Sequence, residues 1–329
     1  MMNNNTYGSE SSLVVLLVYV YDIILVGPSS TCVAKVQQKL QSMFKLKVLG
    51  SLKYFLGLEI AKSSKGISLC QRKYALSLLD DTGYLGCKPA SLPMDPNLTL
   101  LDGEPIPDPS LYRHLIGRLM YLTISRPGIT FVVHKLSQYM KNPMTTYLNV
   151  VHHLLQYLKS APGQGLFFPT TNSLHLSAYA DADRGGCLDT RKSTTVSWKF
   201  VKQGTVSKSS AESEYRALSS VASEIERLKR LLTHFGILID SAMLFCDNKS
   251  TIHLASNPSL HERSKHIDID CHFIQELVQF RVFSLIHVKT QHQIAHVFTK
   301  ALPASVLSAS WVSLTFTLQL EGNITHSYF

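Results

Sequence analysis

Leu13–Gly27 reads LVVLLVYVYDIILVG, and this stretch decides how the rest of the chain is interpreted. Two apolar, β-branched runs flank the polar tip Tyr21-Asp22, a pattern typical of two buried strands joined by a tight turn. A signal peptide or a membrane span could also give an apolar run near an N-terminus. However, the preceding residues carry no Lys or Arg, the run is shorter than a bilayer requires, and Asp22 interrupts it. A strand pair that served only as core would not explain Asp22.

The composition is that of a globular protein with a polyanionic partner. The 329 residues allow two or three domains, with 45% hydrophobic and 17% charged residues. A net charge of +9 favours nucleic acid as the partner. The six cysteines form no CxxC pair, which argues against a zinc knuckle or redox motif and indicates free thiols in a reducing compartment. We therefore expect an intracellular protein, cytoplasmic or nuclear, that is neither secreted nor membrane-bound.

Periodicity and turn residues divide the chain into elements. Two strands are expected around the turn Ser63–Gly66, and a helix is expected from Gln71. Six prolines between Pro89 and Pro109 exclude a helix interior and mark a linker. Further helices are predicted in the segments that follow: Tyr112–Ile124, Phe131–Met140 and Tyr147–Leu158.

A set of carboxylates follows in the last third of the chain. Asp181 and Asp247 each stand at the end of an expected strand, and Glu212 and Glu214 lie near the start of a helix between them. Such a convergence of oxygen ligands suits Mg²⁺. The helix is specified by an apolar stripe that includes the following residues: Tyr215, Leu218, Val221, Ala222, Ile225, Leu228, Leu231, Leu232 and Phe235.

Structural explanations compete for each of these acids. Ser209 followed by Glu212 fits a capping box, so we favour Glu214 as the metal-facing residue. Asp181 lies in a turn-rich stretch, and Asp247 could cap a helix at residues 250–256. The residues alone leave both alternatives open.

A family resemblance favours the metal-binding role of these acids. The chain resembles the Pol polyproteins of copia-type LTR retrotransposons. In their reverse transcriptases the hairpin reads Tyr-Val-Asp-Asp, where this chain has Tyr19, Val20, Tyr21 and Asp22. The resemblance runs from about Leu13 to Leu302. It is carried by these further segments: Leu49-Gly50, Tyr54–Ile60, Gln71–Tyr74, Cys87–Pro89, Tyr112–Leu122, Arg126-Pro127 and Ser137–Met140.

The resemblance implies an α+β or α/β fold in several parts. Residues 13–88 would be the C-terminal part of a reverse transcriptase, with the palm hairpin and a thumb-like region. Residues 89–170 would be a linker and helical connection, and residues 171–302 a ribonuclease H-like mixed sheet with flanking helices. Residues 303–329 would be a divergent tail.

The family activities are RNA-directed DNA synthesis and cleavage of RNA in RNA–DNA hybrids. The first catalytic aspartate of the polymerase is expected to lie outside this chain, Tyr21 replaces the second, and Asp22 remains. One carboxylate cannot hold two metal ions, so we predict an inactive polymerase. By resemblance, Asp181, Glu214 and Asp247 would bind two Mg²⁺ or Mn²⁺ ions that activate water against the RNA strand.

Two departures predict a weak or absent ribonuclease H activity. The fourth acid of the family is His296 here, within the run Gln293–Lys300, and a neutral imidazole suits softer ions. Only 33 positions separate Asp181 from Glu214, which is fewer than in the family. The missing segment, at the junction of Thr195 and Val196, would be the second strand of the sheet. Its loss would leave backbone hydrogen-bonding groups of the neighbouring strands unpaired.

A polar run at residues 260–273 also resembles the family sequence. Arg263, Lys265 and His266 are candidates for phosphate contacts, and a helix is expected over Asp268–Val278. The leading hypothesis is a degenerate retrotransposon Pol remnant. The alternatives are a non-catalytic nucleic-acid-binding module and a poorly folded pseudogene product, and the sequence indicates no oligomeric state.

Overall fold

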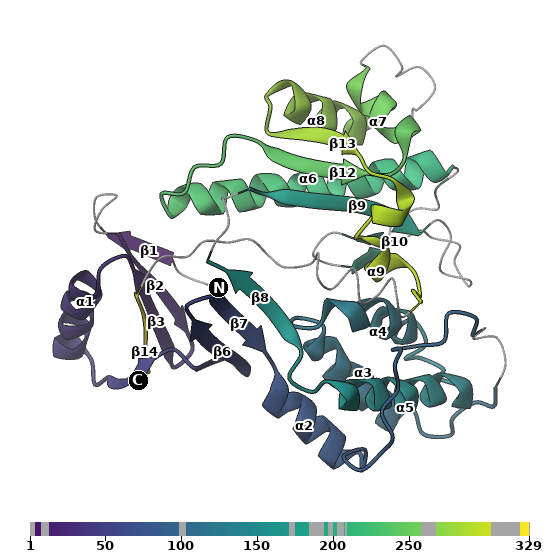
Figure 1. Ribbon diagram of the computed structural model, residues 1–329, viewed down its shortest axis with the longest axis horizontal. Coiled ribbons are helices and arrows are strands. Elements are labelled where there is room, and N and C mark those ends of the chain that lie inside the picture. The colour runs from purple at the N-terminus through teal and green to yellow at the C-terminus, as the bar shows by residue number, and fades with distance from the viewer. Residues whose placement is uncertain are drawn as a thin grey trace.

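The computed structural model describes residues 4–7, 13–98, 103–170, 175–183, 194–196, 200–202, 207, 209–257, 268–303 and 323–328. Helices and strands are mixed along the chain, which confirms the predicted α+β character. The strands form three sheets, and most helices gather beside the second sheet or against the third (Figure 1). Within the described residues, no helix has both the length and the apolar composition needed to cross a bilayer.

The opening stretch forms the predicted hairpin, in which Tyr19 is paired with Asp22 and the turn is Val20-Tyr21. Val20 has a positive φ of 51°, as tight hairpin turns require. The hairpin belongs to a five-stranded sheet in the order β1-β2-β3-β14-β4. Its strands are β1 (Asn4–Tyr7), β2 (Val14–Tyr19), β3 (Asp22–Gly27), β4 (Lys47–Ser51) and β14 (Asn323–Tyr328), and α1 (Ser30–Met43) packs on it through Val33.

A second sheet leads into a helical core. Its order is β5-β6-β7-β8, formed by β5 (Tyr54–Phe55), β6 (Leu58–Ser63), β7 (Gly66–Cys70) and β8 (Gly165–Pro169). The predicted turn at Ser63–Gly66 is confirmed, because Ser63 pairs with Gly66 at the end of the β6–β7 ladder.

The helical core lies to the lower right of this sheet in Figure 1. It contains α2 (Arg72–Asp81), α3 (Ser110–Leu122), the 3-10 helix η1 (Pro127–Ile129), α4 (Thr130–Ser137) and α5 (Thr145–Ser160). All four α-helices were predicted from periodicity, and their observed ends differ from the predicted ones by at most a few residues. The proline-rich segment has no described helix, and it is not a detached linker, since Met94 is buried among these helices.

The third sheet mixes parallel and antiparallel strands in the order β11-β10-β9-β12-β13. Its members are β9 (Ser177–Asp183), β10 (Thr194–Val196), β11 (Phe200–Lys202), β12 (Ala242–Cys246) and β13 (Phe283–His287). Its helices are α6 (Ser210–His234), α7 (Lys249–Ser256) and α8 (Asp268–Gln279). The predicted stripe of α6 is buried from Tyr215 to Ile225 and only partly buried beyond it.

The expected loss of a whole strand from this sheet was wrong. Thr194–Val196, at the expected deletion, forms β10 and pairs antiparallel with the Asp181–Asp183 half of β9. These three residues pair with β9 beside Asp181 on one side and with β11 on the other. The shortening therefore reduces the antiparallel edge without removing it.

Candidate metal centre

Asp181 lies inside β9, where it is paired with Val196 of β10. It is therefore a strand residue, and its position excludes the turn interpretation. Its side chain is only 2% exposed and accepts a hydrogen bond from the hydroxyl of Thr299. A buried carboxylate needs such a donor, because an unpaired buried charge is strongly unfavourable.

Asp247 follows β12 directly and faces the same region. The helix after it is capped by its neighbour, since Asn248 Oδ1 accepts a hydrogen bond of 3.1 Å from the amide of Thr251. Asp247 is therefore not the N-cap residue of α7, which was the alternative that the sequence left open. Hydrogen bonding by His296 is the main cause that lowers the pKa of Asp247, and Thr290 adds to it against the opposing effect of burial.

The two glutamates of α6 have different surroundings. The hydroxyl of Ser209 accepts a 3.1 Å hydrogen bond from the amide of Glu212, and the Glu212 carboxylate lies 2.7 Å from Arg216. Glu214 is 8% exposed, and its Oε2 has no hydrogen-bond partner.

Burial, followed by the charges of Asp181 and Asp247, raises the pKa of Glu214 far above its ordinary value of 4.5. A hydrogen bond from the backbone of Ala182 and the charge of Lys300 act in the opposite direction. Glu214 therefore shares the site of the two aspartates, and in the absence of a cation it holds a proton at neutral pH.

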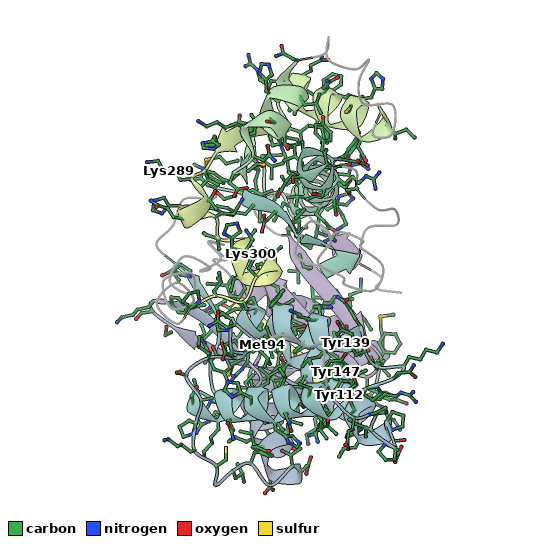
Figure 2. The ribbon with its side chains drawn as sticks, turned by 90° about the vertical axis from the view of Figure 1, so that its right-hand side faces the viewer. Met94, Tyr112, Tyr139, Tyr147, Lys289 and Lys300 are labelled. Carbon is green, nitrogen blue, oxygen red and sulfur yellow. The ribbon has the colours of Figure 1, made fainter. Side chains whose placement is uncertain are left out.

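His296 begins the short helix α9 (His296–Thr299) and lies between the two aspartates. Its Nε2 is 3.7 Å from Asp181 Oδ2 and 3.6 Å from Asp247 Oδ2. Lys300 Nζ lies 2.9 Å from the same ring nitrogen. Figure 2 shows Lys300 at the level where the helical core meets the third sheet.

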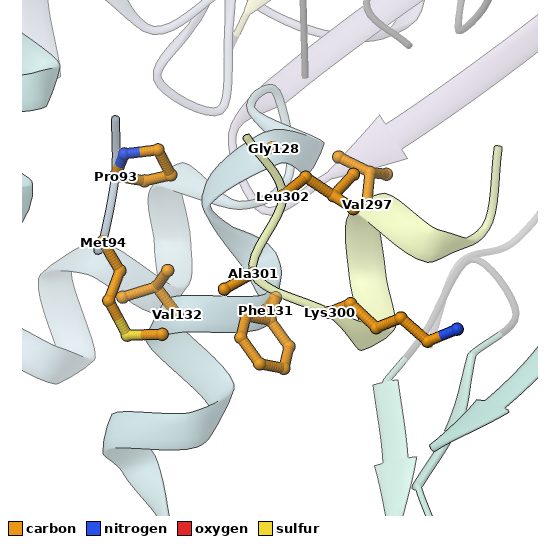
Figure 3. Close-up of a pocket in the computed structure, with 9 residues that line it drawn as sticks. All are labelled: Pro93, Met94, Gly128, Phe131, Val132, Val297, Lys300, Ala301 and Leu302. Carbon is orange, nitrogen blue, oxygen red and sulfur yellow. The ribbon is translucent and has the colours of Figure 1, made fainter. Parts of the chain in front are cut away.

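Helix α9 is held by both neighbouring parts of the molecule. Val297 is buried in the helical core, whereas Thr299 faces Asp181. A small pocket separates α9 and its extension from α4; Figure 3 shows Val297, Ala301 and Leu302 on one side, and Phe131 and Val132 on the other. Just before α9, Gln293 donates a 2.9 Å hydrogen bond to the carbonyl of Ala180 on β9.

The carboxylates fit a divalent cation. Among the described residues, one group of three potential ligand atoms lies within 4.8 Å of one another, from Glu214, Cys246 and Asp247. Burial raises the pKa of Cys246 to about 12, so its thiol stays protonated and is no ligand for a hard ion. Glu214 Oε2 has no hydrogen-bond partner, and a cation held with Asp247 would supply one.

The hairpin around Tyr21 and Asp22 has no comparable cluster among the described residues. Asp22 begins β3, and Tyr21 is 69% exposed at the tip. Asp22 belongs to no group of three potential metal ligands in the part of the chain that the structure describes.

The remaining candidates divide into those that lie outside the described residues and those that the sequence argument missed. Arg263, Lys265 and His266 are outside the described residues, and their phosphate contacts stay predictions. Thr299 and Lys300 were not singled out, although their spacing from His296 places them within one turn of it. That spacing was the available signal.

Comparison with known proteins gives consistent relatives. The family described as "Reverse transcriptase (RNA-dependent DNA polymerase)" matches residues 2–96. The retrovirus-related Pol polyprotein from transposon RE2 of Arabidopsis thaliana is 38% identical over 304 residues, covering 88% of this chain and 21% of the relative. The corresponding polyprotein from transposon TNT 1-94 of Nicotiana tabacum is 31% identical, covering 90% of this chain and 24% of its own length.

A shorter relative is matched over most of its length. An uncharacterised mitochondrial protein of Arabidopsis thaliana is 38% identical over 221 residues, which is 64% of this chain and 92% of that protein. In contrast, the chain spans only about a fifth of the length of the RE2 polyprotein.

Proposed function

The chain belongs to the family of retrotransposon Pol polyproteins with a reverse transcriptase domain, and from this premise we propose that its third sheet forms a ribonuclease H-like, metal-dependent nuclease site. The substrate would be the RNA strand of an RNA–DNA hybrid. One observation carries the proposal: Glu214 is buried against Asp181 and Asp247 with an oxygen that lacks a partner.

The residues have separable roles. Asp181, Glu214 and Asp247 would hold Mg²⁺ or Mn²⁺, which when bound polarises a phosphodiester and lowers the pKa of water. Thr299 orients the Asp181 carboxylate, and His296 is placed to hydrogen-bond Asp247. The net charge of +9 favours retention of the polyanionic substrate.

We propose that cleavage is slow or absent. His296 supplies no negative charge in its neutral form where the family has a fourth acid, so the site attracts a second hard cation less strongly. We further propose that the polymerase hairpin is inactive, because Tyr21 stands in place of a metal ligand beside Asp22.

One assay tests the nuclease proposal. The full chain is incubated with a labelled RNA–DNA hybrid and Mg²⁺ or Mn²⁺, beside Asp181→Asn. Glu224→Gln, which changes an acid on α6 that pairs with Arg227, is the control. Slow cleavage that disappears only in Asp181→Asn supports the site. Cleavage of equal rate in both variants contradicts it.

Binding and melting measurements on the same samples test the two alternatives, a non-catalytic binding module and a poorly folded product. Hybrid retention that weakens with salt, without any cleavage, would favour the non-catalytic binding module. A broad thermal transition without cooperativity would favour a poorly folded product.

A further inference from the structure

Strand β14 is a central member of the first sheet, although it comes from the other end of the sequence. All six of its residues, Asn323–Tyr328, pair antiparallel with β3. On its other side, Thr325–Tyr328 pairs antiparallel with β4. β14 therefore stands between β3 and β4 in the strand order, and Figure 1 shows it in yellow beside β3, on the opposite side of the view from α9.

The chain that leads to β14 is long enough to reach another molecule. Residues 304–322 separate Pro303, at the end of the preceding described segment, from Asn323. At about 3.3–3.6 Å per residue, a link of about 20 residues can span up to about 70 Å. The covalent chain therefore permits β14 to enter either its own first sheet or the first sheet of a neighbouring copy.

The edge of β3 that β14 covers is a strong acceptor for a strand. β3 reads DIILVG, so residues 23–26 are apolar and include neither a charge nor a proline. Charged residues and prolines are the devices that normally prevent an open strand edge from pairing with another chain. If β14 left its place, the apolar edge of β3 would be open, and β4 would present a second edge opposite it.

We propose that the space between β3 and β4 is a strand-acceptor site that also takes β14 from a second copy of this chain. Reciprocal exchange of β14 would join two copies into a dimer. Such an exchange has a low cost, because each copy replaces its own β14 contacts by identical contacts from its partner.

An irregularity in the ladder favours a second copy over an unrelated strand as the occupant. The pairing of β14 with β4 shifts register between His326 and Ser327. Such a bulge places one extra residue in the pairing and bends the strand locally, so it depends on a particular sequence and register. A second β14 reproduces the shift at the same position.

A pair of opposed residues makes the exchange measurable. Thr325 of β14 lies opposite Ser51 of β4, and Ser51 is exposed. Opposed Cα atoms of antiparallel strands lie about 4.5–5.5 Å apart, which is within the range that a disulfide can bridge. Two full-length copies with different tags are co-expressed, one with Ser51→Cys and the other with Thr325→Cys, and are oxidised after purification.

Two further samples serve as reference and control. The double variant Ser51→Cys/Thr325→Cys in one chain measures pairing within a single copy. In the matched control, Asn323→Cys replaces Thr325→Cys, which moves the thiol about 6.6 Å along β14 and out of reach of position 51. The crosslinked positions are identified by mass spectrometry.

We expect a disulfide between position 51 of one copy and position 325 of the other, at least about tenfold more abundant than the control crosslink. A disulfide within the double variant but none between the co-expressed copies would overturn the exchange. Absence of both disulfides, or an equal yield from Asn323→Cys, would overturn it as well.

A second measurement requires no added cysteine. Light scattering of the unmodified chain should show a dimer whose share rises with concentration. Thr325→Pro removes a backbone N–H from a strand that is paired on both sides and should abolish the dimer, whereas Thr325→Val keeps the N–H and should retain it. An unmodified chain that stays monomeric at all concentrations would overturn the inference, and neither measurement depends on the metal centre.

Discussion

Replacing Glu214 by Gln should stabilise the metal-free protein and remove part of its pH dependence. The carboxyl is buried beside Asp181 and Asp247, and its pKa in the folded chain lies far above the ordinary value of 4.5. For a group with a raised folded-state pKa, the stability is fully present below the unfolded pKa and is lost as pH rises through the folded value. The unmodified chain should therefore lose stability from about pH 4.5 upward.

The size of this stability difference follows from the interval between the ordinary pKa of Glu214, 4.5, and the pH of the measurement. A carboxyl that remains protonated in the folded chain at pH 7, although its ordinary pKa is 4.5, destabilises the fold by about 3 kcal/mol at roughly 1.4 kcal/mol per pH unit. Gln has the same shape and no proton to lose. The difference in unfolding free energy between variant and unmodified chain should grow from near zero at pH 4.5 to about 3 kcal/mol at pH 7.

Urea unfolding followed by circular dichroism at several pH values, in the presence of a chelator, measures this difference. Glu224→Gln on the same helix is the control, because its carboxylate pairs with Arg227 at the surface. The reasoning is refuted if Glu214→Gln is no more stable than the unmodified chain at pH 8. Mn²⁺ at a hundredfold excess over its Kd should add about 2.7 kcal/mol to the unmodified chain and less to the variant, so the difference between them at pH 7 should shrink towards zero.

Three further substitutions probe the supports of the site. Thr299→Val removes the hydroxyl that donates to Asp181 and should lower the unfolding free energy by about 1.5–3 kcal/mol in urea titrations, and weaken Mn²⁺ binding by calorimetry. Asn248→Ala removes the cap of α7 and should lower stability by about 1 kcal/mol, measured in the same way. Val297→Ala truncates a buried contact of α9 and should lower stability by about 2 kcal/mol and weaken Mn²⁺ binding, although Val297 belongs to the helical core.

Each of these expectations has its own contradicting result. Unchanged Mn²⁺ affinity in Thr299→Val would show that the hydroxyl does not orient Asp181. A stability loss in Asn248→Ala below about 0.3 kcal/mol would show that the α7 cap is unimportant. Val297→Ala with lowered stability but normal Mn²⁺ affinity would separate helix packing from the metal centre.

Much of the fold could be predicted because local signals agree with tertiary structure. The hairpin is encoded by two apolar, β-branched runs around a polar tip, and α6 by an apolar stripe whose buried part runs from Tyr215 to Ile225. Where local chemistry had two solutions, the structure was needed. Only the structure shows that Asn248 rather than Asp247 caps α7.

The failures have a common physical origin in long-range contacts. A strand of three residues, Thr194–Val196, has too little length for a periodic signal, and its pairing with β9 depends on a distant partner. The burial of Met94 in a proline-rich segment likewise depends on helices that come later in the sequence. Lys300 could be recognised as part of the site only from its contact with His296.

Helix α9 has a consequence for the order of assembly during synthesis. It carries His296 and Thr299 towards the acids, while Val297 seals against helices that are made much earlier. Domains generally fold in the order in which they leave the ribosome, so the earlier helices form the surface on which α9 later docks. The proposed metal centre would therefore be completed last, because a growing chain that already contains Asp181, Glu214 and Asp247 lacks His296 and Thr299 until α9 emerges. The same dependence would make the helical core contribute to the proposed metal site through its contact with Val297.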